Sequence, residues 1–146
     1  MQYGLQSRYD QKPVGVVSIR EVTRLGTISM RYFVLEAARV TGWLLAAIIA
    51  VLSFVPPWLR PQTPMPQGLE HFAIFAITGF AFGIGYNRRP IPVMVALVIF
   101  AAAIEIAQLY VPGRHARLSD FIVDALALCL GVAVALVPAR TLLQGA

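Results

Sequence analysis

Residues 105–124 hold many ionisable side chains for a chain as apolar as this one. The stretch reads EIAQLYVPGRHARLSDFIVD and contains three carboxylates, two arginines and one histidine between two long apolar runs. Carboxylates and histidine can act as general acids and bases, and arginine binds carboxylate or phosphate in a bidentate manner. Ionisable side chains among membrane-spanning segments usually serve a function. The stretch is therefore the first candidate for a functional site.

The elements that must position these side chains are membrane helices. Of the 146 residues, 58% are hydrophobic and only 13% are charged, a composition outside the usual range of soluble domains. A helical span needs about 20 apolar residues, and the runs 37–56, 67–86, 91–111 and 119–137 meet this requirement. The sequence predicts an all-α membrane protein, a four-transmembrane-helix bundle with a short cytoplasmic amino-terminal arm.

Helix-breaking residues mark the ends of these runs. Proline-rich or glycine-containing segments follow the first three runs, and Pro138 follows the fourth, so we expect the fourth helix to end there. Ser119 or Asp120 is expected to cap its start. The predicted layout is an arm at 1–36 that is loose or forms an interfacial helix, a membrane domain at 37–138 and a tail at 139–146.

The distribution of basic residues predicts the orientation. Nine of the twelve lie on, or just inside, one side of the predicted spans: Arg8, Lys12, Arg20, Arg24, Arg31, Arg39, Arg88, Arg89 and Arg140. The positive-inside rule places that side in the cytoplasm. We expect a multi-pass membrane protein with both termini cytoplasmic. The net charge of +5 then reflects topology and contact with membrane lipids, without nucleic-acid binding.

Three ionisable side chains on separate helices are expected at a similar depth. At about 1.5 Å per residue, His71, Glu105 and Asp124 each lie within about two turns of the outer ends of their spans. A carboxylate inside a span costs at least about 2.5 kcal/mol, so these groups should face one another and not lipid. The sequence therefore predicts a polar pocket that opens outward.

Further polar residues are spaced to join this pocket. Gln108 shares a helix face with Glu105, and Asp120 shares one with Asp124, because residues three or four apart lie on one side of a helix. We predict acid–base or hydrogen-bonding roles for His71, Glu105, Asp120 and Asp124. The predicted ligand-binding residues are Gln108, Arg114, Arg117 and Ser119.

These residues, in this order, resemble a known family. The resemblance rests on His71-Phe72, Glu105-x-x-Gln108, Pro112-Gly113-Arg114, Ser119-Asp120, Asp124 and Gly131. It covers about residues 37–137 and points to the VanZ-like family of small bacterial membrane proteins. The chain departs from the family pattern at Gln67-Gly68, where Asp-Lys is frequent, and at Asp124, where Asn is usual.

The resemblance implies a setting in the cell envelope. The member that gives the family its name is associated with low-level resistance to teicoplanin, a glycopeptide antibiotic. The implied place is the outer face of the inner membrane, near cell-wall or exopolysaccharide metabolism. We therefore predict binding of an anionic or polyhydroxylated envelope ligand, such as a lipid-linked wall precursor, an exopolysaccharide or a glycopeptide.

Other readings of the same residues stay open at this point. The charges can form a structural ion-pair network that fixes the third and fourth helices, and the protein can be a non-catalytic accessory subunit of a larger membrane complex. The residue types also suit a metal ion, but no ligand spacing supports one, and no metal or other cofactor is predicted. A transporter is disfavoured because the short spans provide no paired discontinuous helices. Whether the site is catalytic is left open.

Overall fold

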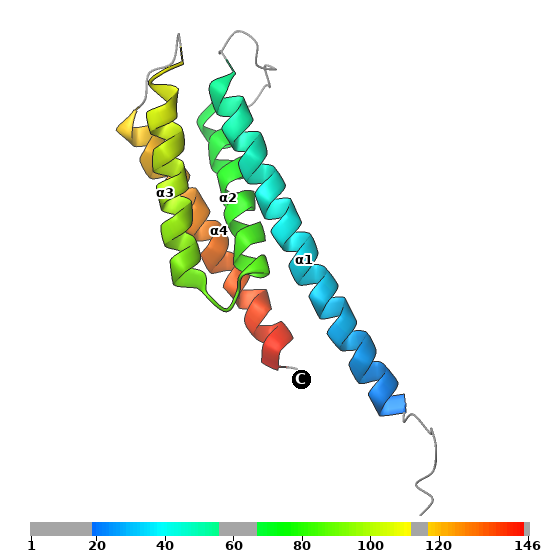
Figure 1. The fold of residues 1–146 in the computed structure, drawn as a ribbon. Helices are drawn as coiled ribbons and strands as arrows, with labels where there is room; N and C mark the ends of the chain where they lie inside the picture. The colour runs from blue at the N-terminus through cyan, green and yellow to red at the C-terminus, as the bar shows by residue number, and fades with distance from the viewer. Residues whose placement is uncertain (1–18, 56–66, 112–116, 145–146) are drawn as a thin grey trace, which may run out of the picture. The chain divides into compact units, whose positions relative to one another are not determined.

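Four α-helices make up the chain where the computed structural model describes it, at residues 19–55, 67–111 and 117–144. They are α1 (Ile19–Phe54), α2 (Gln67–Gly85), α3 (Pro90–Gln108) and α4 (Leu118–Gln144) (Figure 1). Each helix contains a stretch that is long and apolar enough to cross a membrane. The predicted class, an all-α protein with four membrane helices, is confirmed.

Two helix ends differ from the sequence prediction. The first helix was expected near residue 37 but begins at Ile19, so residues 19–36 of the predicted arm belong to a helix that continues into the span. The fourth helix was expected to end at Pro138 but continues to Gln144, so that prediction is wrong. A proline within a helix lacks the N–H that would bond the carbonyl four residues earlier, here that of residue 134, and its ring crowds that carbonyl. Membrane helices tolerate such a local disturbance.

Consecutive helices run antiparallel. The chain divides into two compact units, Met1–Arg31 and Tyr32–Ala146, and the contacts between helices lie in the second. Near the end of α1, Ser53 contacts Gln108 at the end of α3, and farther back in α1, Arg39 contacts Gly85 at the end of α2. One end of this unit therefore gathers the end of α1, the start of α2, the end of α3 and the start of α4.

The closest helix contact joins α2 to α4 through glycines. A Cβ atom added at Gly79 would lie 2.1 Å from the carbonyl oxygen of Leu128, and one added at Gly131 would lie 2.1 Å from that of Ala76. Gly83 approaches Ala135 in the same interface. Small residues let membrane helices pack at short distance, where dispersion and weak polar contacts hold them together. In the sequence, the four-residue spacing of Gly79 and Gly83 already predicts a close helix contact, and the structure confirms it.

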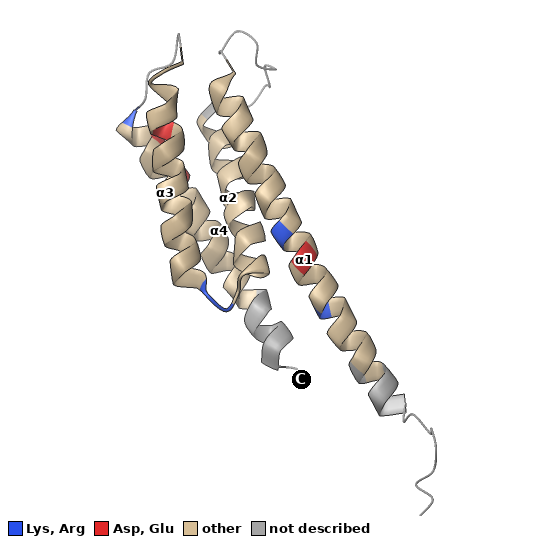
Figure 2. Cartoon of the chain, viewed as in Figure 1, with Lys and Arg blue, Asp and Glu red and all other residues tan. Residues whose placement is uncertain are grey.

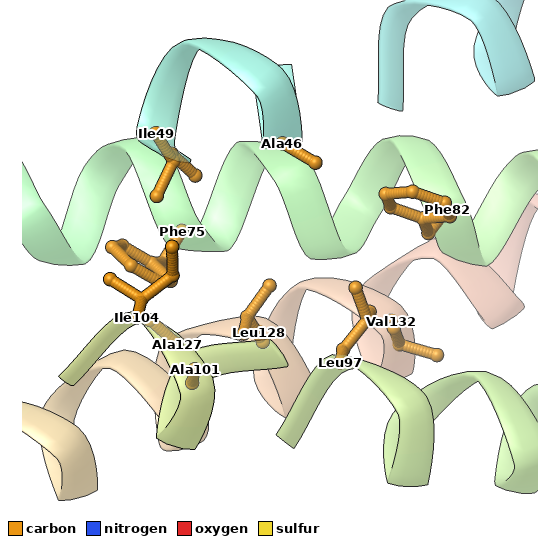
Figure 3. Packing of buried hydrophobic residues seen from close by; sticks show 10 residues of the cluster. All are labelled: Ala46, Ile49, Phe75, Phe82, Leu97, Ala101, Ile104, Ala127, Leu128 and Val132. Atoms are coloured by element: carbon orange, nitrogen blue, oxygen red, sulfur yellow. The ribbon is translucent and has the colours of Figure 1, made fainter. Parts of the chain in front are cut away.

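Apolar side chains from all four helices meet in one core (Figure 3). Its members are Ala46 and Ile49 of α1, Phe75 and Phe82 of α2, Leu97, Ala101 and Ile104 of α3, and Ala127, Leu128 and Val132 of α4. Thr78 is fully buried beside them and its hydroxyl donates to the carbonyl of Ile74 at 2.7 Å. The outer faces carry many exposed large hydrophobic side chains, as expected for helices surrounded by lipid.

Candidate functional site

The charged residues of α3 and α4 gather near one end of these helices (Figure 2). The acidic positions of α3 and α4 lie toward one end of these helices, whereas the turn between α2 and α3 carries Arg88 and Arg89 at the other. We call His71, Glu105, Asp120 and Asp124 the polar cluster. Its members come from the start of α2, the end of α3 and the start of α4.

Asp124 is the buried centre of the polar cluster. Its side chain is only 6% exposed, and its Oδ1 lies 4.0 Å from Nδ1 of His71, whose side chain is 27% exposed. The imidazole also stacks against the buried ring of Phe75, with 6.4 Å between ring centroids. Because Phe75 lies one turn beyond His71, its ring supports the imidazole on the side away from the start of α2. The pair thus links α2 to α4 by an acid–base contact.

Glu105 reaches from α3 to the start of α4. Its Oε1 accepts a hydrogen bond of 2.5 Å from the backbone N–H of Arg117, the residue directly before α4. The first N–H groups of a helix have no partner within the helix and carry partial positive charge, so a carboxylate is favoured there. Glu105 therefore caps α4 from a neighbouring helix. The guanidinium of Arg117 is not needed for this contact.

The predicted capping residues of α4 do not have that role. The helix begins at Leu118, so Ser119 and Asp120 both lie inside its first turn, and the prediction is wrong. The hydroxyl of Ser119 instead donates to Oδ1 of Asp120 at 3.0 Å. Both side chains are exposed, so Asp120 forms the accessible edge of the polar cluster. A capping residue was sought next to the helix start, but the N–H of Arg117 donates to Glu105, which lies twelve residues earlier in the sequence.

The three carboxylates are near enough to interact electrostatically. Asp124 experiences the charges of both Glu105 and Asp120, and Glu105 experiences that of Asp120. Like charges this close repel unless a cation, a proton or a hydrogen-bond donor lies between them. The cluster is therefore rich in acceptors and suited to a ligand that brings donors.

Gln108 turns toward a different helix. Its amide Nε2 donates to Oγ of Ser53 in α1 at 3.4 Å, and both side chains are buried. Ser53 is a polar residue that sequence reasoning missed. The signal was a serine within an apolar run, because hydroxyls in membrane spans commonly bond a neighbouring helix. The structure therefore places Gln108 in a contact between α1 and α3.

Two further expectations concern residues 112–116 and metal ions. Arg114, a predicted ligand contact, lies outside the described residues. Across the ranges that the structure describes, no three His, Cys, Asp or Glu side chains are grouped closely enough to hold a metal ion. The chemistry that the described geometry supports is hydrogen bonding and proton exchange, with Asp124 and His71 inside and Asp120 at the accessible edge.

The chain matches a known protein family. The model of the family described as VanZ/LLP1 matches residues 20–139. No curated protein and no solved structure matched the chain in the corresponding searches. The matched range contains all four candidate membrane spans of the described residues, from Leu25 to Val137.

Proposed function

From the premise that this chain belongs to the VanZ/LLP1 family, we propose that it is an envelope membrane protein whose polar cluster binds a hydroxyl-rich headgroup. The ligand class is a lipid-linked saccharide such as a wall or exopolysaccharide precursor, or a glycopeptide. The polar cluster supplies the acceptors, and Arg117 and Ser119 lie beside it for contacts with an anionic part of the ligand.

The observation that carries the proposal is the burial of Asp124 beside His71. A carboxyl group inside a membrane helix is unfavourable by at least about 2.5 kcal/mol, and here two further carboxylates lie within electrostatic reach of it. A purely structural contact between α2 and α4 needs no such group, because their glycines already pack closely. A functional demand on the carboxylates accounts for their presence at this depth.

A sugar suits the polar cluster better than a simple anion. Ionised carboxylates only accept hydrogen bonds, and hydroxyl groups can donate to them. An anion would meet repulsion from any of these carboxyl groups that is ionised. The anionic part of a lipid-linked saccharide therefore belongs on the side of Arg117, with the sugar hydroxyls on the carboxylates.

Binding of a saccharide lipid tests this proposal. In lipid nanodiscs, we expect a fluorescent polyprenyl-diphosphate disaccharide to bind more tightly than the same polyprenyl diphosphate without sugar. Asp120→Asn removes one acceptor charge at the accessible edge and should weaken disaccharide binding about tenfold, the effect of a lost charge-assisted hydrogen bond. Leu118→Ala, at a neighbouring exposed apolar position, is the matched control and should bind as the parent does.

Equal binding of the two lipids would contradict the proposal, because the polar cluster would then not recognise hydroxyl groups. A second result would also overturn it: neither lipid binds, and the protein is recovered from native membranes only in stoichiometric complex with a larger membrane protein. That result favours the accessory-subunit alternative.

The proposal also requires the polar cluster to face away from the cytoplasm. Nine of the twelve basic residues support this orientation through the positive-inside rule. In a Cys129→Ala background, cysteines at Gln62 and Ala116 should react with a membrane-impermeant thiol reagent on intact spheroplasts. A cysteine at Asn87 should react only after lysis. The reverse pattern would place the polar cluster on the cytoplasmic side and contradict the proposed function at the outer face of the membrane.

A further inference from the structure

A groove lies at the opposite end of the second unit from the polar cluster, near the turn between α2 and α3. Its volume is about 350 Å³, and its lining includes Trp43 of α1, Phe82 and Tyr86 at the end of α2, and Leu97 and Phe100 of α3. Phe82 and Leu97 are buried, whereas Trp43 remains 62% exposed. Hence the groove has a packed apolar floor and an accessible aromatic wall.

Aromatic contacts fix the shape of this wall. The ring of Phe82 meets Trp43 edge to face at a centroid distance of 5.4 Å and stacks with Tyr86 at 5.9 Å. The indole N–H of Trp43 donates to the hydroxyl of Tyr86 at 3.2 Å, so the polar atoms of both aromatic side chains are engaged with each other. The absence of a side chain at Gly42 leaves room for the Phe82 ring, 3.1 Å from where a Cβ would stand.

The charge at the groove is confined to one end. Arg89, the residue before α3, lines it, and Arg88 is its neighbour in the turn. Both side chains are exposed, and among the described side chains neither guanidinium has a carboxylate partner. Arg39 differs, because it pairs with Glu36 and donates to the carbonyl of Gly85.

We propose that the groove binds one anionic phospholipid, with an acyl chain between α1 and α3 and its phosphate on Arg89 and Arg88. The groove runs from the turn into the candidate spans that hold Trp43, Phe82 and Leu97, so its apolar part lies where acyl chains lie. The arginines carry charge opposite to that of the phosphate and can bind it bidentately. This lipid site is separate from the polar cluster and does not depend on the proposed saccharide ligand.

The tryptophan in the wall provides a direct measurement. The chain has two tryptophans, so Trp58→Phe leaves Trp43 as the only one. In detergent, we expect phosphatidylglycerol with brominated acyl chains to quench Trp43 fluorescence saturably. Half-saturation should need about tenfold less of this lipid than of phosphatidylcholine with the same chains, because the choline cation of the latter offsets the phosphate charge that attracts the arginines. Arg89→Gln should remove the difference between the two lipids.

A second pair of variants tests the apolar part of the groove. Ala96 lines it and is exposed, so Ala96→Phe should fill it and abolish saturable quenching by both lipids. Val95 is its neighbour on α3, is 54% exposed and lies off the groove, so Val95→Phe is the matched control and should leave quenching unchanged.

Two results would overturn the lipid site. The first is equal, non-saturable quenching by both lipids in the parent and in the Ala96→Phe variant. The second is a change of oligomeric mass in the Ala96→Phe variant with lipid quenching retained, because the groove would then hold a second copy of the chain. Arg89→Gln alters only an exposed side chain, so it still decides the headgroup claim if the Ala96 variant does not fold.

Discussion

Gly131→Ala is expected to lower the free energy of unfolding by about 3 kcal/mol, the upper part of the range for overpacking a close contact. The added methyl group would stand 2.1 Å from the carbonyl oxygen of Ala76 and 2.7 Å from the backbone nitrogen of Phe80. Both atoms belong to the α2 backbone, so no side chain can rotate to make room. The two helices must separate, and separation weakens every contact along their shared face.

The measurement is reversible unfolding in mixed micelles, followed by circular dichroism. Gly79→Ala should have a similar effect, because its methyl group would stand 2.1 Å from the carbonyl oxygen of Leu128 in the same interface. Gly68 provides the control: it lies in the first turn of α2, and a Cβ there meets nothing within 4 Å. Gly68→Ala should leave stability unchanged or raise it by up to about 1 kcal/mol, since alanine favours helix. Equal losses in all three variants would show that helix proximity is not the cause.

The helices themselves follow from the sequence with little ambiguity. A backbone in lipid must satisfy its hydrogen bonds within the segment, so a long apolar run becomes a helix whatever its neighbours do. The glycine spacing at Gly79 and Gly83 likewise predicted a close contact, because only a missing side chain permits it. The partner of these glycines, α4, was not predicted, since spacing along one helix says nothing of which helix approaches.

The polar residues were predictable in depth but not in their partners. Counting along the spans brought His71 and Asp124 to a similar level, where the structure has them 4.0 Å apart. Gln108 was expected beside Glu105 but bonds Ser53, because the rotation of α1 about its axis decides which side chain faces it. Ser119 or Asp120 was expected to cap α4, but the cap is Glu105 of α3, and a contact between helices cannot be predicted from the local sequence. The groove near Tyr86 is lined by residues of three helices, so it could not be predicted from any one segment of the sequence.

Glu105 combines two roles that different substitutions can separate. As the cap of α4 it needs only an acceptor oxygen, which Glu105→Gln retains. As a member of the polar cluster it contributes negative charge, which Glu105→Gln removes. Glu105→Leu removes both the acceptor and the charge at nearly the same side-chain size. The difference between these variants therefore distinguishes capping from ligand recognition.

We expect Glu105→Gln to keep the free energy of unfolding within about 1 kcal/mol of the parent, because a neutral acceptor still meets the N–H of Arg117. Glu105→Leu should lose about 1–2 kcal/mol, the effect of removing a helix cap. Binding of the disaccharide lipid should fall at least about tenfold in both variants, since both lack the charge. Unfolding in mixed micelles and binding in nanodiscs measure the two effects independently.

The opposite separation would argue for a structural role. If Glu105→Gln binds the disaccharide lipid as the parent does, and only Glu105→Leu loses binding in step with its stability, then Glu105 serves α4 alone. The ligand contacts would then reduce to His71, Asp120 and Asp124. Leu109→Ala, at a 62% exposed position directly after α3, is the control for changes at this end of the helix and should alter neither quantity by a measurable amount. A loss of binding in Glu105→Gln at unchanged stability has no explanation in capping and requires the carboxylate charge itself.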